Sequence, residues 1–588
     1  MTLRTSSVSR KATWGLVGTT IRKNVGLLVL MMVGLLLLNP GLMLTDLDGI
    51  RNEDLLIWLR ELDKLTVVVN TVFSACAVLL FNFVNFQFLY TTRAGDVFFA
   101  LPLTRGSLLF ARAFSGFVLS LVPAALGYTA TAAVHAVLGI DTGLKILLGG
   151  MIFTVLAALL FCVFSLVFIV AAGNVFDLLV SFATVNIGPV FLVLAYHAAC
   201  QELLLGYAGV DETLGIEAVS PVALCGNMVA KYLYGKKWVS LSAVGLGRYL
   251  GVLAWIVVCG VLAAVLFRRR PTEASGKSYA FRFMPILCSM ILSVLGGFAI
   301  GMMFSQGELN PVFWIFLAVG CLLTAIVFGA MTSRGFKTLK TSFAIGGSAL
   351  LVTALVAVIL SSGGFGYTTR MPKVGKIQKA TGTFSRYYEV EATPVEALDL
   401  HRETLKYLDE MRDVDYEKQE YVYVRMAYTL KNGKVVERSF HVPQKKAVKE
   451  KLLTVYKSPA RINQIETMVE NTTEKHEISV WQGEYLGGQQ PYLNQCTIYV
   501  SDDDLRRIAS AYVKDLPNAP MEGMLEDQAA DEYTIDWWRE GPEVFNGSLT
   551  LRVEPSFEHT RAVLEELDLE GRAKKQHENR EESGYYKD

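Results

Sequence analysis

No charged residue occurs in any of nine long hydrophobic runs of this sequence. Of its 588 residues, 52% are hydrophobic and only 19% carry a charge, a balance too apolar for an ordinary soluble enzyme. Each run is long enough to cross a hydrocarbon core of about 30 Å. The runs lie at residues 25–44, 65–90, 113–138, 146–173, 178–200, 249–267, 283–305, 311–331 and 342–363. The sequence therefore predicts a membrane all-α domain of about nine transmembrane helices, spanning residues 25–363.

The sequence also lacks an excess of charge of either sign. Its 55 Lys and Arg residues equal its 55 Asp and Glu residues. No net field therefore draws the chain to nucleic acid, and we expect no nucleic-acid partner. The eight cysteines show no C-x-x-C spacing, and only Cys496 lies in a polar part of the chain. Neither a disulfide framework nor a metal site is expected.

A nucleotide-binding motif is missing as well. Gly276-Lys277-Ser278 resembles the end of a phosphate-binding loop. Pro271 stands where that loop needs its first glycine, and no strand precedes it. We therefore expect no Walker motif, no ATP hydrolysis and no catalytic residue on this chain.

Polar side chains within the runs are few. His135 and His197 have no carboxylate partner in any run, so hydrogen-bonded histidines at helix interfaces are favoured over proton carriers or metal ligands. Asn82, Asn85 and Gln87 could line a polar path, although hydrogen bonding between helices is the favoured role. Ion-coupled carriers need ionisable groups near the middle of the membrane. An ion-coupled carrier or channel is therefore disfavoured.

Basic residues alternate with acidic ones from loop to loop, which predicts the orientation of the helices. They gather before the first run and after runs two, six and eight: Arg4, Arg10, Lys11, Arg22 and Lys23; Arg93, Arg105 and Arg112; Arg268, Arg269, Arg270, Lys277 and Arg282; Arg334, Lys337 and Lys340. Residues 1–24 and these loops should be cytoplasmic. With nine crossings the C-terminus lies outside, and an even number would reverse this.

The segment between runs five and six is long and amphipathic. Residues 200–248 begin with acidic side chains, contain the short apolar stretch Ser220–Leu224, and end with basic ones. The apolar stretch is too short to cross a membrane. We predict an outer segment with a re-entrant or interface-lying helix rather than a tenth span.

From residue 364 to residue 570 the sequence predicts a soluble, extracytoplasmic α+β domain. Thr393-Pro394-Val395-Glu396 is a capping box and predicts a helix that continues to about Met411. Residues 421–430 and 435–442 predict a hairpin with Asn432-Gly433 in a type I′ turn. Ser501 and Ser556 mark two further helix starts, each expected after a strand. Residues 571–588 are highly charged and predict a disordered tail.

Two loop sequences resemble a known family. Residues 92–105, T-R-A-G-D-V-F-F-A-L-P-L-T-R, are similar to the S-L-P-[IV]-[TS]-R signature of permease subunits in the type-two exporter class of ABC transporters, with Ala100 in place of the usual serine. Residues 268–281, R-R-R-P-T-E-A-S-G-K-S-Y-A-F, are similar to the R…E-x-A-G-K-x-x-A-F loop of large Firmicutes-type members, with Ser275 inserted. The hairpin around Asn432-Gly433 resembles the C-terminal domain appended to some of them.

The resemblance implies a multi-pass plasma-membrane permease that exports a hydrophobic or amphiphilic substrate, such as an antibiotic, peptide, lipid or drug. It implies a separate ATPase subunit that binds ATP and Mg²⁺, and a second permease subunit in a homo- or heterodimer. In that family a short helix after the second span docks on the ATPase. The implied coupling residues are Arg93, Asp96, Phe98, Phe99, Leu101, Pro102 and Arg105, and those of the second loop are Arg269, Arg270, Glu273, Gly276 and Lys277.

The residues themselves agree with a docking helix. Arg93, Asp96 and Arg105 flank the apolar stretch Val97–Leu101, a pattern typical of an interface helix that Pro102 would stop. A helix lying on the membrane surface with snorkelling arginines is the alternative. For the whole chain, the alternative is a membrane-anchored receptor or sensor whose outer domain binds a ligand or envelope component.

Overall fold

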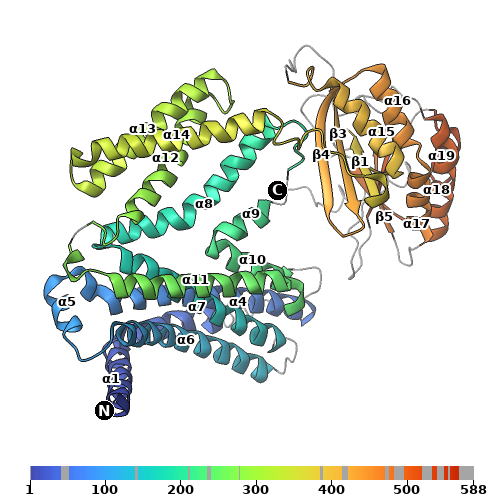
Figure 1. The fold of residues 1–588 in the computed structure, drawn as a ribbon. Helices are drawn as coiled ribbons and strands as arrows, with labels where there is room; N and C mark the ends of the chain where they lie inside the picture. The colour runs from blue at the N-terminus through green and yellow to red at the C-terminus, as the bar shows by residue number, and fades with distance from the viewer. Residues whose placement is uncertain are drawn as a thin grey trace, which may run out of the picture. The chain divides into compact units, whose positions relative to one another are not determined.

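The computed structural model of the chain is mostly helical, and its named strands all lie between residues 377 and 553 (Figure 1). It describes residues 2–41, 52–138, 144–209, 212–234, 240–276, 278–384, 388–412, 421–470, 476–482, 495–519, 533–538, 549–553 and 556–568. Lys277 and the tail predicted for residues 571–588 lie outside the described residues.

Eight helices of the described residues are long and apolar enough to cross a membrane. They are α4 (Asn52–Phe86), which continues into the 3-10 turn η3 (Gln87–Tyr90), α6 (Arg105–Leu138), α7 (Leu144–Ala171), α8 (Val175–Leu203), α11 (Leu246–Arg269), α12 (Phe283–Phe304), α13 (Pro311–Ser333) and α14 (Leu339–Ser361). The last eight of the nine predicted runs lie on these helices. The chain is therefore a membrane-embedded helical protein by the length and composition of its helices.

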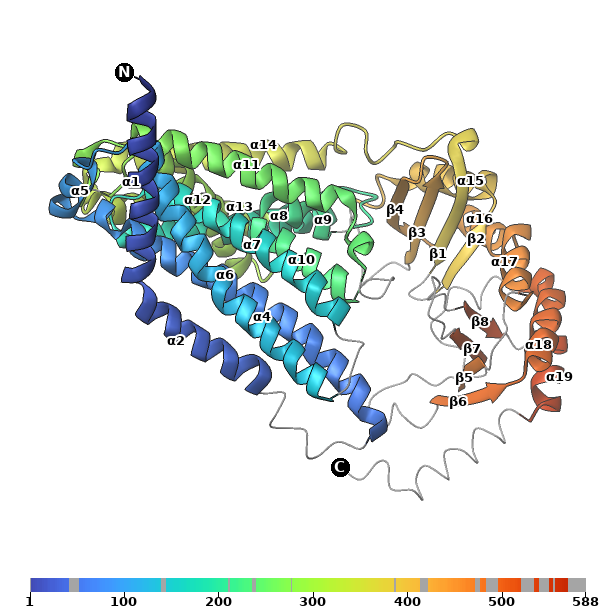
Figure 2. The same ribbon diagram turned by 90° about the horizontal axis from the view of Figure 1, so that it is seen from below.

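The first predicted run lies on a bent pair of helices. α1 (Thr2–Lys23) and α2 (Val25–Leu36) meet at a 57° bend (Figure 2). The Asn24 amide holds this corner, because it donates to the Thr20 carbonyl and to Asn85 Oδ1, each at 2.9 Å. The 12 residues of α2 extend about 18 Å, less than a hydrocarbon core. The described residues thus include eight membrane-length helices, or nine if this pair counts as one span.

The outer segment folds as short helices. α9 (Glu212–Val219) and α10 (Pro221–Tyr234) have 8 and 14 residues, too few to cross a membrane. The Tyr232 hydroxyl donates to the Ile146 carbonyl at 3.0 Å, and Met228 and Val229 join a core that includes residues of α7 and α11. α10 is therefore packed against the long helices rather than crossing as a tenth span.

α7 is the most enclosed of the membrane-length helices. In its 18-residue apolar stretch 72% is buried, compared with 17% in that of α14. The reason is that α4, α6 and α11 surround α7 (Figure 2). α12 and α13 form a tight hairpin. A Cβ on Gly320 would lie 2.9 Å from the Gly296 carbonyl oxygen, so the close approach of these two helices requires glycine.

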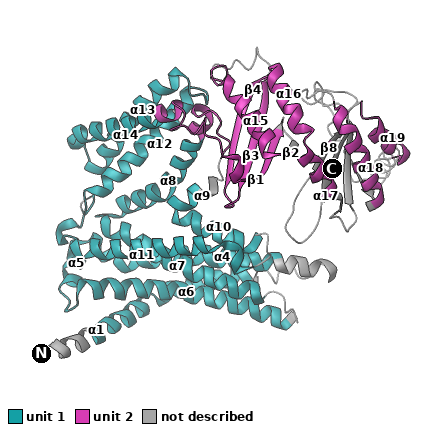
Figure 3. Cartoon of the chain, turned by 45° about the vertical axis from the view of Figure 1, so that its right-hand side comes forward, with its two compact units in different colours: residues 1–197, 211–356 teal, residues 198–210, 357–588 magenta. Residues whose placement is uncertain are grey.

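The chain divides into two compact units, residues 1–197 with 211–356, and residues 198–210 with 357–588 (Figure 3). The described residues of unit 2 form two four-stranded antiparallel sheets. The first, in the order β2-β1-β3-β4, contains β1 (Ile377–Phe384), β2 (Tyr388–Ala392), β3 (Tyr421–Leu430) and β4 (Val435–Pro443). The second, in the order β6-β5-β7-β8, contains β5 (His476–Gln482), β6 (Gln495–Val500), β7 (Tyr533–Trp538) and β8 (Leu549–Val553). The accompanying helices are α15 (Pro394–Thr404), α16 (Lys446–Tyr456), α17 (Pro459–Glu470), α18 (Asp502–Asp515) and α19 (Glu558–Glu566).

The two sheets repeat one chain path. Each half has a strand pair (β1–β2 or β5–β6), a helix (α15 or α18), a second pair (β3–β4 or β7–β8) and a further helix (α16 or α19). In each half one capping residue, Thr393 or Ser501, separates the strand from its helix and accepts a hydrogen bond from the backbone N–H three residues on. Unit 2 therefore contains an internal structural repeat that the sequence patterns did not indicate.

Some local predictions for unit 2 are confirmed and others are wrong. The capping box at Thr393 and the strands before α18 and α19 are confirmed. The first helix ends at Thr404 and continues only as the 3-10 turn η8 (Leu405–Tyr407), so its predicted end at Met411 is wrong. Thr404 Oγ1 donates to the Leu400 carbonyl at 3.0 Å, a back-bond that weakens a helix.

The hairpin of β3 and β4 is confirmed, but its turn is not type I′. Of the two central residues only Gly433 has a positive φ, +78°, whereas a type I′ turn needs two. Leu430 N donates to the Lys434 carbonyl and Gly433 N to the Leu430 carbonyl, each at 2.8 Å. These contacts define a three-residue loop with glycine in the left-handed position, the next commonest hairpin connection.

A short segment after α8, residues 204–207, completes the edge of the first sheet within unit 2. Ser439 of β4 donates its N–H to the Gly206 carbonyl at 3.2 Å and its hydroxyl to the Tyr207 carbonyl at 2.6 Å. Gly206 has a φ of +83°, and a Cβ there would lie 2.7 Å from the Phe440 ring. We call this segment the strap. It occupies edge groups that would otherwise be open for pairing.

Candidate functional site

α5 (Thr92–Phe99), the helix between the second and third runs, has two distinct faces. Arg93, Asp96 and Val97 are exposed, and Val97 retains 64% of its surface. Phe98 and Phe99 turn inward, with ring centroids 4.6 and 6.1 Å from that of Phe88. This amphipathic pattern anchors the helix by its aromatic face and leaves a charged and apolar face open.

The end of α5 differs from the prediction. The helix ends at Phe99, before Leu101 and Pro102, and Leu101 N already donates to the Phe98 carbonyl in a turn. The residue before a proline is disfavoured in helical conformation, so the chain leaves the helix ahead of the proline ring. Leu101 is half-buried and Pro102 is exposed. The helix therefore ends three residues before Pro102, which was predicted to stop it, and leaves Ala100 and Leu101 outside.

Arg105 turns inward instead of offering a surface charge. Its Nη1 donates to the carbonyls of Arg268 and Arg270 at 2.9 and 2.7 Å. Its guanidinium also lies 5.0 Å from the Phe99 ring centroid, a cation–π contact. The loop after the second run is thereby fastened to the loop after the sixth.

Arg270 is the centre of this junction and is only 2% exposed. Its guanidinium donates to the carbonyls of Val170, Ala172 and Leu89, the last two at 2.7 and 3.1 Å. These acceptors include the C-terminal end of α7, where a cation is favoured. Burial lowers the pKa of Arg270 to about 10, so the group remains charged at neutral pH.

Backbone hydrogen bonds tie a third segment into the junction. Gly173 N donates to the Ser278 carbonyl and Gly276 N to the Gly173 carbonyl, each at 3.0 Å, and Ala280 N donates to the Ala171 carbonyl at 2.8 Å. We call the assembly of residues 87–105, 170–174, 268–276 and 278–280 the loop hub. It joins the ends of α4, α6, α7 and α11 at one end of the bundle.

The remaining residues predicted for the second loop lie on the surface of the hub. Arg269, Glu273 and Gly276 are exposed. Gly276 has a φ of +78°, a conformation that favours glycine. The hub thus presents α5 and this second loop as two adjoining exposed segments, since Ser275 Oγ donates to the Leu89 carbonyl at 3.0 Å just before α5.

Only two of the three residues predicted to line a polar path lie together. Asn82 donates to the Cys162 carbonyl at 3.1 Å and to Ser165 Oγ at 2.9 Å. Asn85 donates to the Arg112 carbonyl at 3.1 Å and accepts from Asn24. Gln87 is exposed in η3. Asn82 and Asn85 therefore act as hydrogen-bonding links between helices.

His135 has a carboxylate partner, contrary to the sequence reading. α4 extends beyond its apolar run, and Asp63 Oδ1 lies 3.1 Å from His135 Nε2. The apolar runs alone do not reveal this contact, because Asp63 precedes the run that begins at residue 65. Among the residues that the structure describes, no group of three or more His, Cys, Asp or Glu side chains could hold a metal ion.

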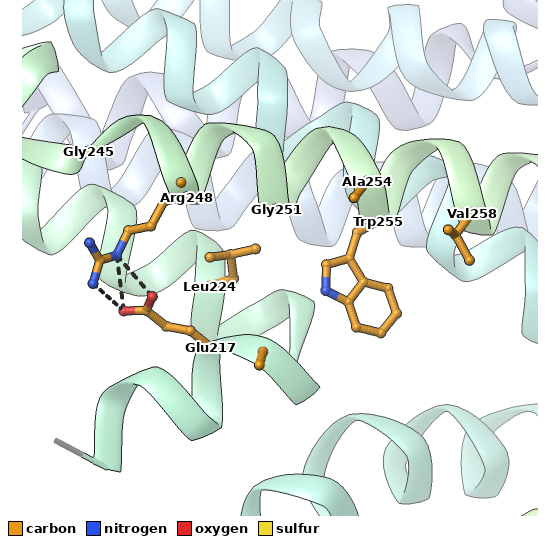
Figure 4. A pocket seen from close by; sticks show the side chains of 10 residues that line it. Glu217, Leu224, Gly245, Arg248, Gly251, Ala254, Trp255 and Val258 are labelled. Carbon is orange, nitrogen blue, oxygen red and sulfur yellow. Dashed lines mark hydrogen bonds and ion pairs between the residues drawn. The ribbon is translucent and has the colours of Figure 1, made fainter. Parts of the chain in front are cut away.

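A pocket of about 530 Å³ lies between the α9–α10 segment and α11 (Figure 4). Leu224, Ala254, Trp255 and Val258 supply its apolar lining, and Glu217 with Arg248 lies at one end. Arg248 Nε is 2.9 Å from Glu217 Oε2. Such a shape suits an apolar chain with a polar group at the paired charges.

No pattern in the sequence predicted this pocket. Glu217 and Arg248 stand 31 residues apart in the chain. From the sequence, Glu217 was placed only among the acidic side chains at the start of this segment, and Arg248 was assigned no role. Comparison of the chain with known proteins adds nothing to these sites, because no family model, curated protein or solved structure matches it.

Proposed function

We propose that this chain is the membrane permease subunit of an ATP-driven ABC transporter of the type-two exporter class, acting with a separate ATPase subunit. The observation that carries the proposal is α5, a short helix that is fixed through its aromatic face and exposes Arg93, Asp96 and Val97. A docking helix needs an open face for its partner and a rigid seat behind it. The loop hub supplies that seat.

The hub also offers a route by which a force on α5 would reach the long helices. Phe98 and Phe99 pack on Phe88, and Phe99 lies 6.2 Å from Phe267 of α11, centroid to centroid. Arg270 bonds the end of α7 to Leu89. Displacement of α5 would therefore move the ends of several helices together, as closure of an ATPase dimer around bound ATP and Mg²⁺ requires.

In this proposal the chain lies in the plasma membrane. The loop hub faces the cytoplasm and unit 2 lies outside the cell. The basic loops after the second, sixth and eighth runs support that orientation. A second permease subunit, identical or related, completes the transporter. The pocket beside Trp255 suits the apolar part of an exported hydrophobic or amphiphilic substrate.

The proposal is tested by purifying the tagged full-length chain in mild detergent and measuring the bound nucleotide hydrolase. We expect Val97→Glu and Asp96→Arg to reduce its recovery at least tenfold, because both change the exposed face without touching the seat. Val137→Glu, the same change at an 87% exposed site at the far end of α6, is the matched control. Equal recovery from all four proteins would contradict docking through α5. Arg105 is unsuitable for this test, since its guanidinium is bonded within the hub.

The second candidate is a membrane-anchored receptor or sensor. The strap favours it, because β4 of the sheet unit is bonded to the segment that directly continues α8. A ligand-induced shift of β4 would reach α8 along the chain. A purified protein that binds an envelope component and never carries a nucleotide hydrolase would favour the receptor.

A further inference from the structure

The interface of α4 and α6 contains a stripe of buried polar groups at the end away from α5. On α6, Gly127, Thr131 and His135 follow one another at intervals of four and share a face. On α4, Asp63 and Asn70 are seven residues apart and also share a face. A Cβ on Gly127 would lie 2.8 Å from Asn70 Oδ1, and His135 contacts Asp63. The two stripes therefore oppose each other.

Several atoms of this stripe are buried without a hydrogen-bond partner. They are Asn39 Nδ2, Asp63 Oδ1, Asn70 Oδ1, Thr131 Oγ1 and both ring nitrogens of His135. All five residues are at least 96% buried. Buried polar groups are almost always satisfied, by protein or by internal water. Their concentration in one place points to a ligand.

On the neighbouring face of α4, by contrast, buried hydroxyl groups have hydrogen-bond partners. Thr71, Thr154 and Tyr128 form a closed network, with hydroxyl separations of 3.0 Å between the threonines and 2.9 Å between Thr154 and Tyr128. Thr71 also donates to the Val67 carbonyl at 2.8 Å. The five residues with unpartnered atoms thus lie on the side of α4 that faces α6 and η1 (Leu37–Gly41). Single unpartnered atoms also occur elsewhere in the bundle, for example at Asn186, Ser289 and Ser293, so the concentration of such atoms is what distinguishes this interface.

Asp63 and His135 are the titratable members of the stripe. Their side chains are 1% and 6% exposed, and Nε2 lies 3.1 Å from Oδ1. The contact lacks hydrogen-bond alignment, although the distance suits an ion pair once the imidazole is protonated. A lone carboxylate in an apolar interior is costly, and a neighbouring cation removes most of that cost.

The other charged groups nearby are engaged elsewhere. On α4, Lys64 bonds Glu61 at 2.5 Å and lies 4.8 Å from the Tyr234 ring of α10. On α6, the described residues between Arg112 and His135 include one titratable group, Tyr128, which is bonded to Thr154. α2 and η1 carry no titratable side chain, and Lys145 of α7 is exposed. Among the side chains that the structure describes, the charge balance of the stripe therefore depends on Asp63 and His135.

We propose that Asp63 and His135 form a proton-binding site between α4 and α6. One proton from water adds to the imidazole, which turns a lone buried carboxylate into a neutral ion pair and stabilises the contact of the two helices. Asn39, Asn70 and Thr131 provide donors and acceptors for the water that delivers the proton. Loss of the proton leaves Asp63 uncompensated and loosens this end of the interface. The site requires neither an ATPase nor a particular cargo.

The sign of the pH effect follows from this charge balance. The proposed ion pair is complete only while the proton is bound, so it stabilises the fold at low pH and ceases to do so as pH rises. Imidazole side chains in general change charge between about pH 5 and 8, so this is the range to measure. Histidines of unit 2 add their own pH dependence. The pH profile of each variant is therefore compared with that of the wild type.

The test is the thermal unfolding midpoint of the detergent-purified full-length chain across that pH range. We expect the stabilisation at low pH to be lost in His135→Gln and to be reversed in Asp63→Asn, where a protonated imidazole would stand alone. Lys145→Gln, a change at an exposed charged residue of the neighbouring helix α7, is the control and should keep the wild-type profile.

The exchanged double variant, Asp63→His with His135→Asp, separates proton binding from simple damage to the fold. It restores both charges in the same place and should recover the low-pH stabilisation, even where a single variant fails to fold. An identical pH profile in the wild type and both single variants would overturn the proposal. So would a double variant that folds yet shows no pH-dependent stabilisation.

Discussion

At the scale of single residues, the side chains that matter most in the loop hub are those whose partners lie far away in sequence. Arg93 and Asp96 were predicted to be exposed on a docking helix, and they are exposed on α5. Arg105 was grouped with them, but its acceptors are 163 and 165 residues away. Local patterns show the charge of an arginine and not where its guanidinium is bonded.

Arg270 gives the first prediction at this scale. Arg270→Met removes the donor to three carbonyls while keeping much of the side-chain length. Buried hydrogen bonds to charged groups contribute about 1.5–3 kcal/mol each, so we expect a destabilisation of about 3 kcal/mol or more in the unfolding of unit 1. Thermal unfolding of the purified chain measures it. Arg269→Met, at the exposed neighbour, should change stability by less than about 0.5 kcal/mol, and equal effects would contradict the role of Arg270.

His401 gives a second prediction, in unit 2. Burial, with a smaller effect of Arg438, lowers the pKa of His401 to about 4 from 6.5. Between these values the unfolded chain binds the proton and the folded chain does not, so stability falls as pH decreases from 6.5 towards 4. The loss amounts to as much as about 3 kcal/mol.

Urea unfolding of the full-length chain at several pH values between 4 and 6.5 tests this prediction. His401→Gln should flatten the pH dependence, although His441, whose pKa burial also lowers, leaves some slope of the same sign. Tyr428→Phe removes the hydroxyl 3.1 Å from His401 Nδ1 but keeps the imidazole, and should retain the slope. A slope unchanged by His401→Gln would show that this histidine does not cause it.

At the scale of helices and strands, apolar runs and capping residues located most elements, whereas bends and turns depended on contacts the sequence does not display. The apolar runs predicted the membrane-length helices, because each run is long and free of charged residues. The corner at Asn24 depends on its bond to Asn85, 61 residues away. The hairpin of β3 and β4 was found from its alternating residues, but the backbone angles of Asn432 decided its turn.

The α12–α13 hairpin gives the prediction for this scale. Gly320→Ala would place a Cβ 2.9 Å from the Gly296 carbonyl oxygen and 2.9 Å from the Gly297 Cα, and backbone atoms cannot move aside cheaply. We expect a loss of about 1–3 kcal/mol from overpacking, measured as a lower thermal midpoint. Gly347→Ala on α14 has nothing within 4 Å of its new Cβ and should be neutral or slightly stabilising. A neutral Gly320→Ala would refute the tight packing of this hairpin.

At the scale of the whole molecule, the sequence predicted a helical membrane part followed by an α+β part, because hydropathy changes sharply near residue 364. It did not reveal the internal repeat of unit 2, since its two halves share a chain path rather than a motif. It also did not show that residues 198–210 belong with unit 2. The bond between Gly206 and Ser439 joins positions 233 residues apart, which no local pattern encodes.

An ion-coupled carrier was disfavoured because the apolar runs lack charged residues, and the structure adds an ionisable pair at the end of two of these helices. Asp63 lies on the same helix as the second run and contacts His135. An ATP-driven permease is therefore distinguished from a gradient-driven one by an ATPase bound to the exposed face of α5, rather than by the lack of ionisable groups.

The most direct measurement places a photo-crosslinking amino acid at Val97 in the full-length chain, irradiates intact cells and identifies the captured protein. Docking through α5 predicts a nucleotide hydrolase with ATP-binding motifs at Val97, and none at Phe110, which is 51% exposed on the neighbouring helix α6. Capture of lipid alone at Val97, or of the same hydrolase equally at both positions, would contradict a permease driven through this helix.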